Sequence, residues 1–436
     1  MAENGSGRAG RLDDVTELRD QPQFSLDSLP PQLREGYRVL AAGAAQILPR
    51  DGLAERLLAA HEQDRPLRVK LGIDPSGVSL TLGHAVVLRK LRQFQDLGHL
   101  AVLVVGGFTG QVGDPSGKTA TRSAQSAEQV IANASGYFEQ LMRILDPART
   151  EVRNNADWLA GLGLGDLLDY TRQLTVAQLL ERDDFARRFA SKAPITLSEF
   201  VYPLLQGIDS VEIRADIELG GTDQTFNNLV GRTLQKAKGQ PPQAVLTMPL
   251  LVGIDGVEKM GKSLDNFVAI SEPPEEQFGK LMRIPDGVVQ LYATLCTSMR
   301  PDQISELAED VAAGGARANA AKRRVAAEVV TLYHGSAAAA AAEARFNAIF
   351  RDRAPQVDAP EYRVELAETV HLPALLMAAG LTTTSSESRR LIDSGGVRIG
   401  GVLVPARHYD VAGSELADQL LSVGKRRVVR VTRSNS

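Results

Sequence analysis

The sequence RVKLGIDPSGVSLTLGHAVVLRKLRQFQDLGHLAVLVV, residues 68–105, decides the fold of the N-terminal part of this chain. An extended apolar stretch at 69–73 is followed by turn formers at 74–77, and helical periodicity then runs over 82–97. A β-branched run bounded by glycine, 100–105, completes the unit. Strand, helix and strand in this order predict a parallel β-sheet covered by helices, so we expect an α/β fold.

The rest of the chain divides by composition. Helix-forming sequence is expected at 37–58, at 127–145 and around Leu179 and Leu204, and beyond Pro285 the pattern is helical and alanine-rich. A proline-containing linker precedes a last unit with two short helices and small strands. We predict, in order, a disordered tail (1–35), an α/β domain with an insertion (36–255), a helical domain (256–355), a linker (356–370) and a small α+β domain (371–436).

Composition excludes several classes of protein. The 436 residues carry 49 Lys and Arg against 53 Asp and Glu, a net charge of -4, so any nucleic-acid surface must be a local patch. No apolar run approaches the ~18 residues of a membrane span, and the polar start, MAENGSGRAGRLDD, lacks the apolar core of a secretory signal. Cys296 is the only cysteine, which excludes an internal disulfide and a cysteine-based zinc site and fits a reducing cytoplasm.

The junction between the first strand and the first helix has the geometry of a ligand site. Residues 71–77 end the strand with turn formers, and 81–84, TLGH, open the helix. A helix N-terminus presents unpaired N–H groups and a partial positive charge, so it can hold phosphates, and His84 can donate to a phosphate oxygen. The alternative is an ordinary connection, since such junctions recur in many α/β proteins.

A second candidate site is the loop Lys259-Met260-Gly261-Lys262-Ser263, between a strand-like stretch at 246–254 and a polar segment. Two ammonium groups on one loop can stabilise the charge that builds on a departing pyrophosphate when a carboxylate attacks the α-phosphate of ATP. The alternative interpretation is a solvated basic turn.

Polar side chains recur along one expected helix. Tyr202, Gln206 and Asp209 are spaced i, i+4 and i+7, so they share one helical face. A core-facing row with a tyrosine, an amide and a carboxylate is costly unless those groups bind something. The row therefore predicts a pocket for a polar ligand.

Taken together, these segments resemble the class I aminoacyl-tRNA synthetases, with 81–84 in the place of the HIGH motif and 259–263 in the place of the KMSKS motif. Within the class the chain is most similar to bacterial tyrosyl-tRNA synthetases, and the similarity covers nearly the whole chain after the tail. It is carried by GGFTGQVGDPSGKTATR (106–122), EFVYPLLQGIDS (199–210) and ELGGTDQTFNNLVGR (218–232).

The resemblance implies a Rossmann-type catalytic domain, a helical anticodon-recognition domain and a C-terminal RNA-binding domain. It implies a cytoplasmic homodimer that activates tyrosine with ATP and esterifies it to tRNA(Tyr), with Mg²⁺ arriving on ATP and without a bound metal site or tightly held cofactor. Two alternatives stay open: a paralogue that activates a tyrosine analogue, and a catalytically silent RNA-binding relative.

The resemblance also implies three sets of site residues. Tyr202 and Gln206 hold the amino group of tyrosine and Asp209 accepts the phenolic hydrogen bond, whereas Asp114 is either a second amino anchor or a turn cap. The catalytic set is Thr81, His84, Lys118, Arg122, Lys259 and Lys262. The tyrosine set is Lys70, Asp74, Asp114, Tyr202, Gln206, Asp209 and Gln224. The ATP set is Gly72, Ser76, Gly83, His84, Gly221, Asp223, Lys259, Lys262 and Ser263.

The chain departs from the family pattern at a few positions. Thr81 replaces the first histidine of the HIGH motif and removes an imidazole donor. Gly261 replaces the middle serine of KMSKS, and both lysines remain. Lys70 stands where many tyrosyl enzymes carry a tyrosine that shares recognition of the phenol, as in a sub-branch that has lysine there, so Asp209 becomes the main discriminator.

The C-terminal segment LLMAAGLTTTSSESRRLIDSGGVRIGGVLV (375–404) resembles the small RNA-binding domain of tyrosyl enzymes, with Ser385 in place of a lysine common there. Arginine and lysine can neutralise RNA phosphates without reading sequence. The alternative for the basic run near 425–430 is a solvated strand end. The expected RNA contacts are Arg389, Arg390, Arg398, Lys425, Arg426 and Arg427, with Arg407 and Arg430 adding charge.

Overall fold

The computed structural model describes residues 25–74, 79–114, 137–350, 359–424 and 427–433. The chain forms two compact units, residues 1–336 and 337–436, and each is described by itself. Along the described part of the chain, no helix is both long and apolar enough to cross a membrane.

The first unit is built on a six-stranded sheet with the strand order β1-β6-β5-β2-β3-β4. Every neighbouring pair is parallel except the edge pair of β1 with β6. The predicted strands 69–73 and 100–105 are confirmed as β2 and β3. The bounds are β1 Gln46–Leu48, β2 Arg68–Ile73, β3 Leu100–Val105, β4 Thr150–Asn154, β5 Ile217–Gly221 and β6 Ala244–Met248.

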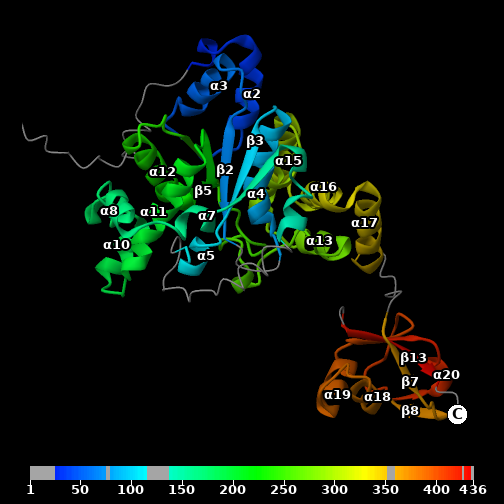
Figure 1. Cartoon of the computed structure of the whole chain (residues 1–436). Coiled ribbons are helices and arrows are strands. Elements are labelled where there is room, and N and C mark those ends of the chain that lie inside the picture. The colour runs from blue at the N-terminus through cyan, green and yellow to red at the C-terminus, as the bar shows by residue number, and fades with distance from the viewer. Residues whose placement is uncertain (1–24, 75–78, 115–136, 351–358, 425–426, 434–436) are drawn as a thin grey trace, which may run out of the picture. The chain divides into compact units, whose positions relative to one another are not determined.

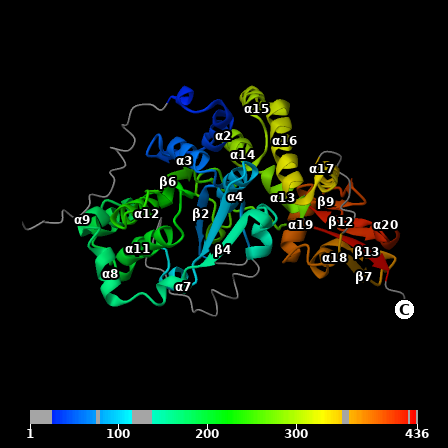
Figure 2. The ribbon, with the colours of Figure 1, turned by 45° about the horizontal axis from the view of Figure 1, so that its top comes forward.

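Helices cover both faces of this sheet. The crossover from β2 to β3 contains α4 (Leu82–Asp96), and the crossover from β5 to β6 contains α12 (Thr225–Ala237). The two crossovers step across the sheet in opposite directions, one towards β4 and the other towards β1. Because such crossovers are right-handed, opposite directions place their helices on opposite faces. Figures 1 and 2 show α4 on one side of the strands and α11 with α12 on the other. The central strands are accordingly buried on both faces and read as apolar runs, as in Ala101 to Val104 of β3.

A glycine brings α11 (Leu197–Glu212), the helix with the polar row, close to α12. A Cβ atom on Gly207 of α11 would lie 2.9 Å from Leu234 Cδ1 and 3.0 Å from Val230 Cγ1 of α12. Both neighbours are fully buried. The glycine therefore allows these two helices to approach one another closely.

The remaining helices of the first unit surround the sheet and continue into a helical region after β6. Its helices near the sheet are η1 Leu26–Ser28, α2 Pro31–Ala41, α3 Gly52–Glu62, α4 Leu82–Asp96, α5 Thr109–Val112, η2 Pro147–Arg149, α7 Ala156–Leu159, α8 Leu164–Thr171, α9 Val176–Leu179, α10 Asp183–Ala190, α11 Leu197–Glu212, η3 Thr222–Gln224 and α12 Thr225–Ala237. The later ones are η4 Lys262–Leu264, α13 Pro274–Leu281, η5 Asp286–Val288, α14 Val289–Cys296, α15 Pro301–Ala313 and α16 Gly315–His334.

The second unit begins one residue into α17, Ser336–Phe350, and contains a five-stranded sheet in the order β10-β9-β12-β13-β7. A separate two-stranded ladder pairs β8 with β11. Buried Leu, Ile and Val side chains from its helices and strands form one core. The bounds are β7 Glu361–Val364, β8 Thr369–His371, α18 Leu372–Ala378, α19 Ser385–Asp393, β9 Val397–Ile399, β10 Val402–Leu403, β11 Asp410–Ala412, α20 Gly413–Leu416, β12 Leu420–Val423 and β13 Arg427–Arg433.

Three sequence predictions need correction. Helix α2 starts inside the expected tail 1–35, because Pro31 at its first position suits a helix start. Strand β1 interrupts the expected helical stretch 37–58, since it pairs with β6. The expected linker 356–370 contains β7 and β8, which propensity alone did not reveal because each gains its stability from pairing with distant strands. Most of the stretch 127–145 lies outside the described residues.

Candidate functional site

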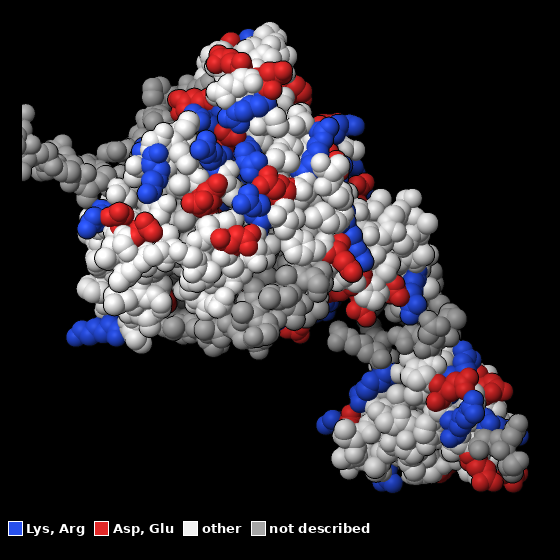
Figure 3. Space-filling model, in the orientation of Figure 1, with Lys and Arg blue, Asp and Glu red and all other residues white. Residues whose placement is uncertain are grey.

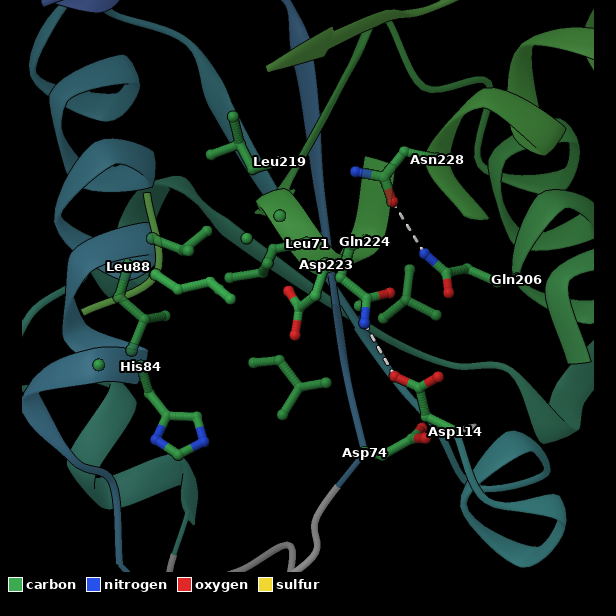
Figure 4. Close-up of a pocket in the computed structure, with 18 of the residues that line it drawn as sticks. Leu71, Asp74, His84, Leu88, Asp114, Gln206, Leu219, Asp223, Gln224 and Asn228 are labelled. Carbon is green, nitrogen blue, oxygen red and sulfur yellow. Dashed lines mark hydrogen bonds between the residues drawn. The ribbon is translucent and has the colours of Figure 1, made fainter. Parts of the chain in front are cut away.

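A cavity of about 380 Å³ opens at the carboxyl ends of β2 and β5. These two strands are neighbours, but their onward connections leave in opposite directions, and such a switch point is where open α/β sheets bind ligands. Figure 4 shows His84 and Leu88 of α4 across the cavity from Gln206 and Asn228. The predicted residues that line it are Gly72, Asp74, Thr81, Gly83, His84, Asp114, Tyr202, Gln206, Asp209, Gly221, Asp223, Gln224 and Lys259.

The start of α4 fixes the state of His84. The Nδ1 atom of His84 accepts the backbone N–H of Thr81 at 3.2 Å and lies 2.8 Å from the Thr81 hydroxyl. The ring proton is therefore assigned to Nε2. Burial, followed by the charges of Lys262 and Lys259, lowers the pKa of His84 to about 4. At neutral pH the ring is an uncharged donor at the helix N-terminus.

The predicted polar row of α11 does face the cavity. Asp209 is 3% exposed, and its carboxylate accepts hydrogen bonds from Trp158 Nε1 at 2.9 Å and Asn155 Nδ2 at 3.3 Å. Burial raises the pKa of Asp209 from 3.8 to about 7, against the opposing effects of Lys70, Trp158 and Asn155. A buried carboxylate near its titration point is typical of a functional site.

Asp74 joins the end of β2 to the opposite wall. Its carboxylate accepts the hydroxyl of Tyr202 at 2.7 Å and that of Thr109 at 2.9 Å. A Cβ atom on Gly106 would lie 1.8 Å from Asp74 Oδ1, so only glycine fits at the end of β3. These contacts set the direction of the Tyr202 ring.

Amide side chains complete the wall on the β5 side. Gln224 Nε2 donates to Asp114 Oδ2 at 2.8 Å, and the amides of Gln206 and Asn228 are hydrogen-bonded at 2.9 Å (Figure 4). Asp114 thus contacts a residue on the far wall of the cavity. A side chain that only capped its own turn would not make this contact.

The loop 259–263 lies at the cavity mouth. Lys259 Nζ is 2.6 Å from Asp223 Oδ2, whereas Lys262 Nζ lies 5.9 Å from the centre of the Tyr137 ring. Partial burial lowers the pKa of Lys262. Asn266, 3% exposed, accepts the N–H of Gly261 at 2.8 Å and donates to Asp255 at 2.6 Å, so it organises the loop. Ser263 is exposed and does not line the cavity.

Lys70, predicted among the tyrosine contacts, does not line the cavity. It is fully buried, and its ammonium is 2.9 Å from Glu218 Oε1. The two residues are paired in register on adjacent parallel strands, so their side chains meet on one face of the sheet. The direct substrate contact is therefore wrong for this structure.

The expected RNA contacts that the structure describes lie in the second unit. Arg389 and Arg390 are exposed on α19, where the Arg389 guanidinium lies 5.5 Å from the Tyr409 ring centre. Arg398 Nη1 donates to Gly401 O at 3.2 Å, and Arg427 Nη1 donates to Leu381 O at 2.6 Å and pairs with Glu387 at 3.1 Å. Five of the predicted site residues lie outside the described residues: Ser76, Lys118, Arg122, Lys425 and Arg426.

Several residues that line or support the cavity and its loop were missed from the sequence: Thr109, Asn155, Trp158, Glu218, Asn228 and Asn266. Asn228 lies within the string 218–232 that carried the resemblance, and Glu218 opens it, but their roles depend on strand and helix pairing. Asn155 and Trp158 stand just after β4, whose carboxyl end is at the cavity edge of the sheet. That position is the signal that could have found them.

Comparisons with known proteins agree on one family. Residues 62–351 match the family model of class I tRNA synthetases (W and Y). The tyrosine–tRNA ligases of Moorella thermoacetica and Carboxydothermus hydrogenoformans are 43% and 44% identical to this chain, each over 92% of it and over 97% and 98% of their own lengths. The tyrosyl-tRNA synthetase of Archaeoglobus fulgidus, solved with L-tyrosine, shares the fold, with a TM-score of 0.58 at 21% identity over 70% of this chain and 99% of its own.

The Asp209→Asn variant tests the electrostatic cost of this cavity. Because the folded-state pKa of Asp209 lies above its ordinary value, the carboxylate destabilises the fold fully above pH 7 and hardly at all near pH 4. We expect Asp209→Asn to unfold at higher urea than the parent chain at pH 8, by the order of 2 kcal/mol, with a smaller difference at pH 5.

The matched control is Asp216→Asn. Asp216 is also buried, but Arg65 holds it in an ion pair at 2.7 Å, so its loss should destabilise the chain at pH 8. A destabilising effect of Asp209→Asn at pH 8 would contradict the assignment of Asp209 as a strained, functional carboxylate.

Proposed function

We propose the function of this chain from one premise: the chain belongs to the class I tRNA synthetases for tryptophan and tyrosine, and its relatives over nearly its full length are tyrosine–tRNA ligases. It is an aminoacyl-tRNA synthetase that activates tyrosine with ATP, releases pyrophosphate and transfers the tyrosyl group to tRNA. The observation that supports tyrosine is the buried Asp209 carboxylate at one wall of the cavity, opposite the polar groups of the cavity mouth.

Asp209 accepts the hydrogen bond of the phenol in this proposal. Trp158 and Asn155 orient its two oxygens, so the carboxylate is positioned before tyrosine arrives. Phenylalanine would leave this buried group without its partner, and sites built on such a bond reject the analogue by up to ~10⁵. Tyr202, Gln206 and Asp114 hold the amino group, and Gln224 lies beside the carboxylate.

ATP occupies the remainder of the cavity, between the N-terminus of α4 and the loop 259–263. The Nε2–H of His84 and the positive end of the α4 dipole face the phosphates. Gly221 and Asp223 serve the ribose. Since Lys259 now pairs with Asp223, ATP must separate them, which frees Lys259 for a phosphate and Asp223 for a ribose hydroxyl.

Catalysis follows from positioning and electrostatics. A tyrosine carboxylate oxygen attacks the α-phosphorus in line, the bond to the bridging oxygen breaks, and pyrophosphate takes the electron pair. Lys259 and Lys262, with Lys118 and Arg122 as the resemblance to the family implies, stabilise the leaving charge. A terminal ribose hydroxyl of the tRNA then attacks the adenylate carbonyl, and AMP leaves. Mg²⁺ enters as the counter-ion of ATP.

The domains after the sheet supply the RNA contacts. The helical region from α13 to α16 lies where the family has its anticodon-recognition domain, and the second unit presents the arginines of α19 and β13 to RNA phosphates. Because the product is charged tRNA for the ribosome, the chain works in the cytoplasm.

A homodimer is supported by exposed apolar side chains on the insertion between β4 and β5. The surface over α10 is largely uncharged in Figure 3. Large hydrophobic side chains of this kind are costly in water and mark an interface when they occur together. They are Leu164, Leu168, Val176, Phe189 and Leu197, which are between 50% and 81% exposed.

Tyrosine-dependent exchange of pyrophosphate into ATP tests the reaction. The full chain should catalyse exchange with tyrosine but not with phenylalanine or tryptophan, and it should then charge total tRNA with tyrosine. Exchange with a different amino acid would instead identify a paralogue. Binding of tRNA without exchange would identify a silent relative.

The Lys262→Ala variant tests the pyrophosphate clamp. We expect the rate of adenylate formation to fall at least a hundredfold, with tyrosine affinity changed less than threefold, because the cation acts on charge that develops in the transition state. Stopped-flow measurement of adenylate formation separates these quantities. Lys238→Ala, on an exposed lysine that does not line the cavity, is the control, and equal losses of rate and affinity would rule out the clamp.

The Leu197→Asp variant tests the dimer. Leu197 is 81% exposed at the first position of α11, where a carboxylate suits the helix N-terminus, so the fold should tolerate it while an apolar interface should not. Light scattering should give the mass of two chains for the parent and of one for the variant. Val402→Asp, at a side chain that is 73% exposed in the second unit, should stay dimeric, and an unchanged Leu197→Asp dimer would exclude this surface.

A further inference from the structure

An ion pair lies inside the first unit, beneath the cavity and out of its reach. Lys70 of β2 is 0% exposed and Glu218 of β5 is 1% exposed, and Lys70 Nζ is 2.9 Å from Glu218 Oε1. Burial of two charges is expensive even when they are paired, and an apolar pair of similar volume often stabilises a fold better. The stability of the sheet alone does not account for this pair.

Both members also bind α11, on the turn that carries the polar row. Lys70 Nζ donates to Gln206 O at 2.8 Å and to Ser210 Oγ at 2.7 Å. Glu218 accepts from Gln206 Nε2 at 3.1 Å and from Ser210 Oγ at 3.0 Å, and it also accepts from Gln243 Nε2. Gln206, about one turn before Asp209, and Ser210, directly after it, are thus tied to the two strands at the switch point.

We propose that Lys70 and Glu218 determine phenol selectivity without touching the substrate: they fix the Gln206–Ser210 turn of α11, and Lys70 supplies the positive charge that faces Asp209. The inference rests on the proposed function. Lys70 is a positioning residue, because its ammonium is bound to α11 and Glu218 and its side chain is absent from the cavity lining.

The surroundings of Asp209 make its charge sensitive to the pair. Lys70 faces it from β2, Glu218 from β5, and Asn155 and Trp158 from the start of α7. Tyr202, two turns earlier on α11, interacts with Asp209 and donates its hydroxyl to Asp74. Lys70 lowers the pKa of Asp209 and Glu218 raises it, and the pKa lies at about 7. Each member of the pair therefore shifts, in opposite directions, the pH below which the acceptor for the phenol is lost.

Because Lys70 and Glu218 shift the pKa of Asp209 in opposite directions, removing each charge should move the pH profile in opposite directions, which a purely structural role does not predict. Lys70→Met removes the positive charge, so Asp209 should take up its proton at higher pH. Glu218→Gln leaves Lys70 uncompensated, so Asp209 should stay ionised to lower pH. Damage to the fold alone would weaken tyrosine binding in both variants without moving their pH profiles in opposite directions.

The experiment measures kcat/KM for tyrosine and for phenylalanine in pyrophosphate exchange between pH 6 and pH 9, on the full chain. For Lys70→Met we expect the tyrosine-to-phenylalanine ratio to fall at least tenfold at pH 7.5 and to recover partly towards pH 9. For Glu218→Gln the fall in the ratio on acidification should begin at lower pH than in the parent chain.

Lys90→Met is the matched control. Lys90 is 3% exposed, and its ammonium is bound by the carbonyls of Val39 and Ala42 and by Gln93, away from the cavity. Its loss should cost stability and leave the selectivity ratio and its pH dependence unchanged.

The outcomes separate this inference from the proposed function. A parent chain that shows no tyrosine-dependent exchange overturns both. A parent chain that exchanges with tyrosine, combined with pH profiles that do not move or that move together in the two variants, overturns the role of the ion pair alone. If Lys70→Met does not fold, the acid shift of Glu218→Gln decides the question by itself.

Discussion

The neighbouring position of β2 and β5 is the constraint on which the rest of the first unit depends. Their onward connections run in opposite directions, so α4 and α12 cover opposite faces and a crevice opens between the two strand ends. That single arrangement brings the N-terminus of α4 and the polar row of α11 to one cavity. It also pairs Lys70 with Glu218, since their register is set by the same two strands. The pairing of β2 with β5 therefore forms both the cavity and the buried ion pair beneath it.

The sequence predicted the central elements well and the assembled site in part. Strands such as 100–105 and the helix at 82–97 follow from periodicity, and the spacing of Tyr202, Gln206 and Asp209 needs only a helix to share a face. Short strands such as β1 and β7 could not be predicted in this way, because they depend on pairing with remote segments. Lys70 was misplaced for the same reason: its partner lies 148 positions away, and only strand register shows that its charge points beneath the cavity.

The cavity combines groups that a stable core would avoid. Burial raises the pKa of Asp209 to about 7, so the carboxylate lies near its titration point, whereas burial and two nearby cations lower the pKa of His84 to about 4 and keep it neutral. In the proposed function, His84 is an uncharged donor at the phosphate end at neutral pH, and the ionised form of Asp209 is the acceptor at the phenol end. In the proposed function, a protonated His84 would add a cation that competes with Lys259 and Lys262 for the same phosphates. The neutral ring can donate a hydrogen bond to a phosphate without adding a positive charge.

The replacement of a histidine by Thr81 fits this division of roles. Thr81 stands at the N-cap of α4, where its backbone N–H and hydroxyl both contact His84 Nδ1. A hydroxyl suits the N-cap of a helix, and it is too short to reach far into the cavity. Its contact holds the His84 ring with Nε2–H directed away from the cap. The position therefore acts through His84, because its two contacts orient the one imidazole that the proposed function places at the phosphates.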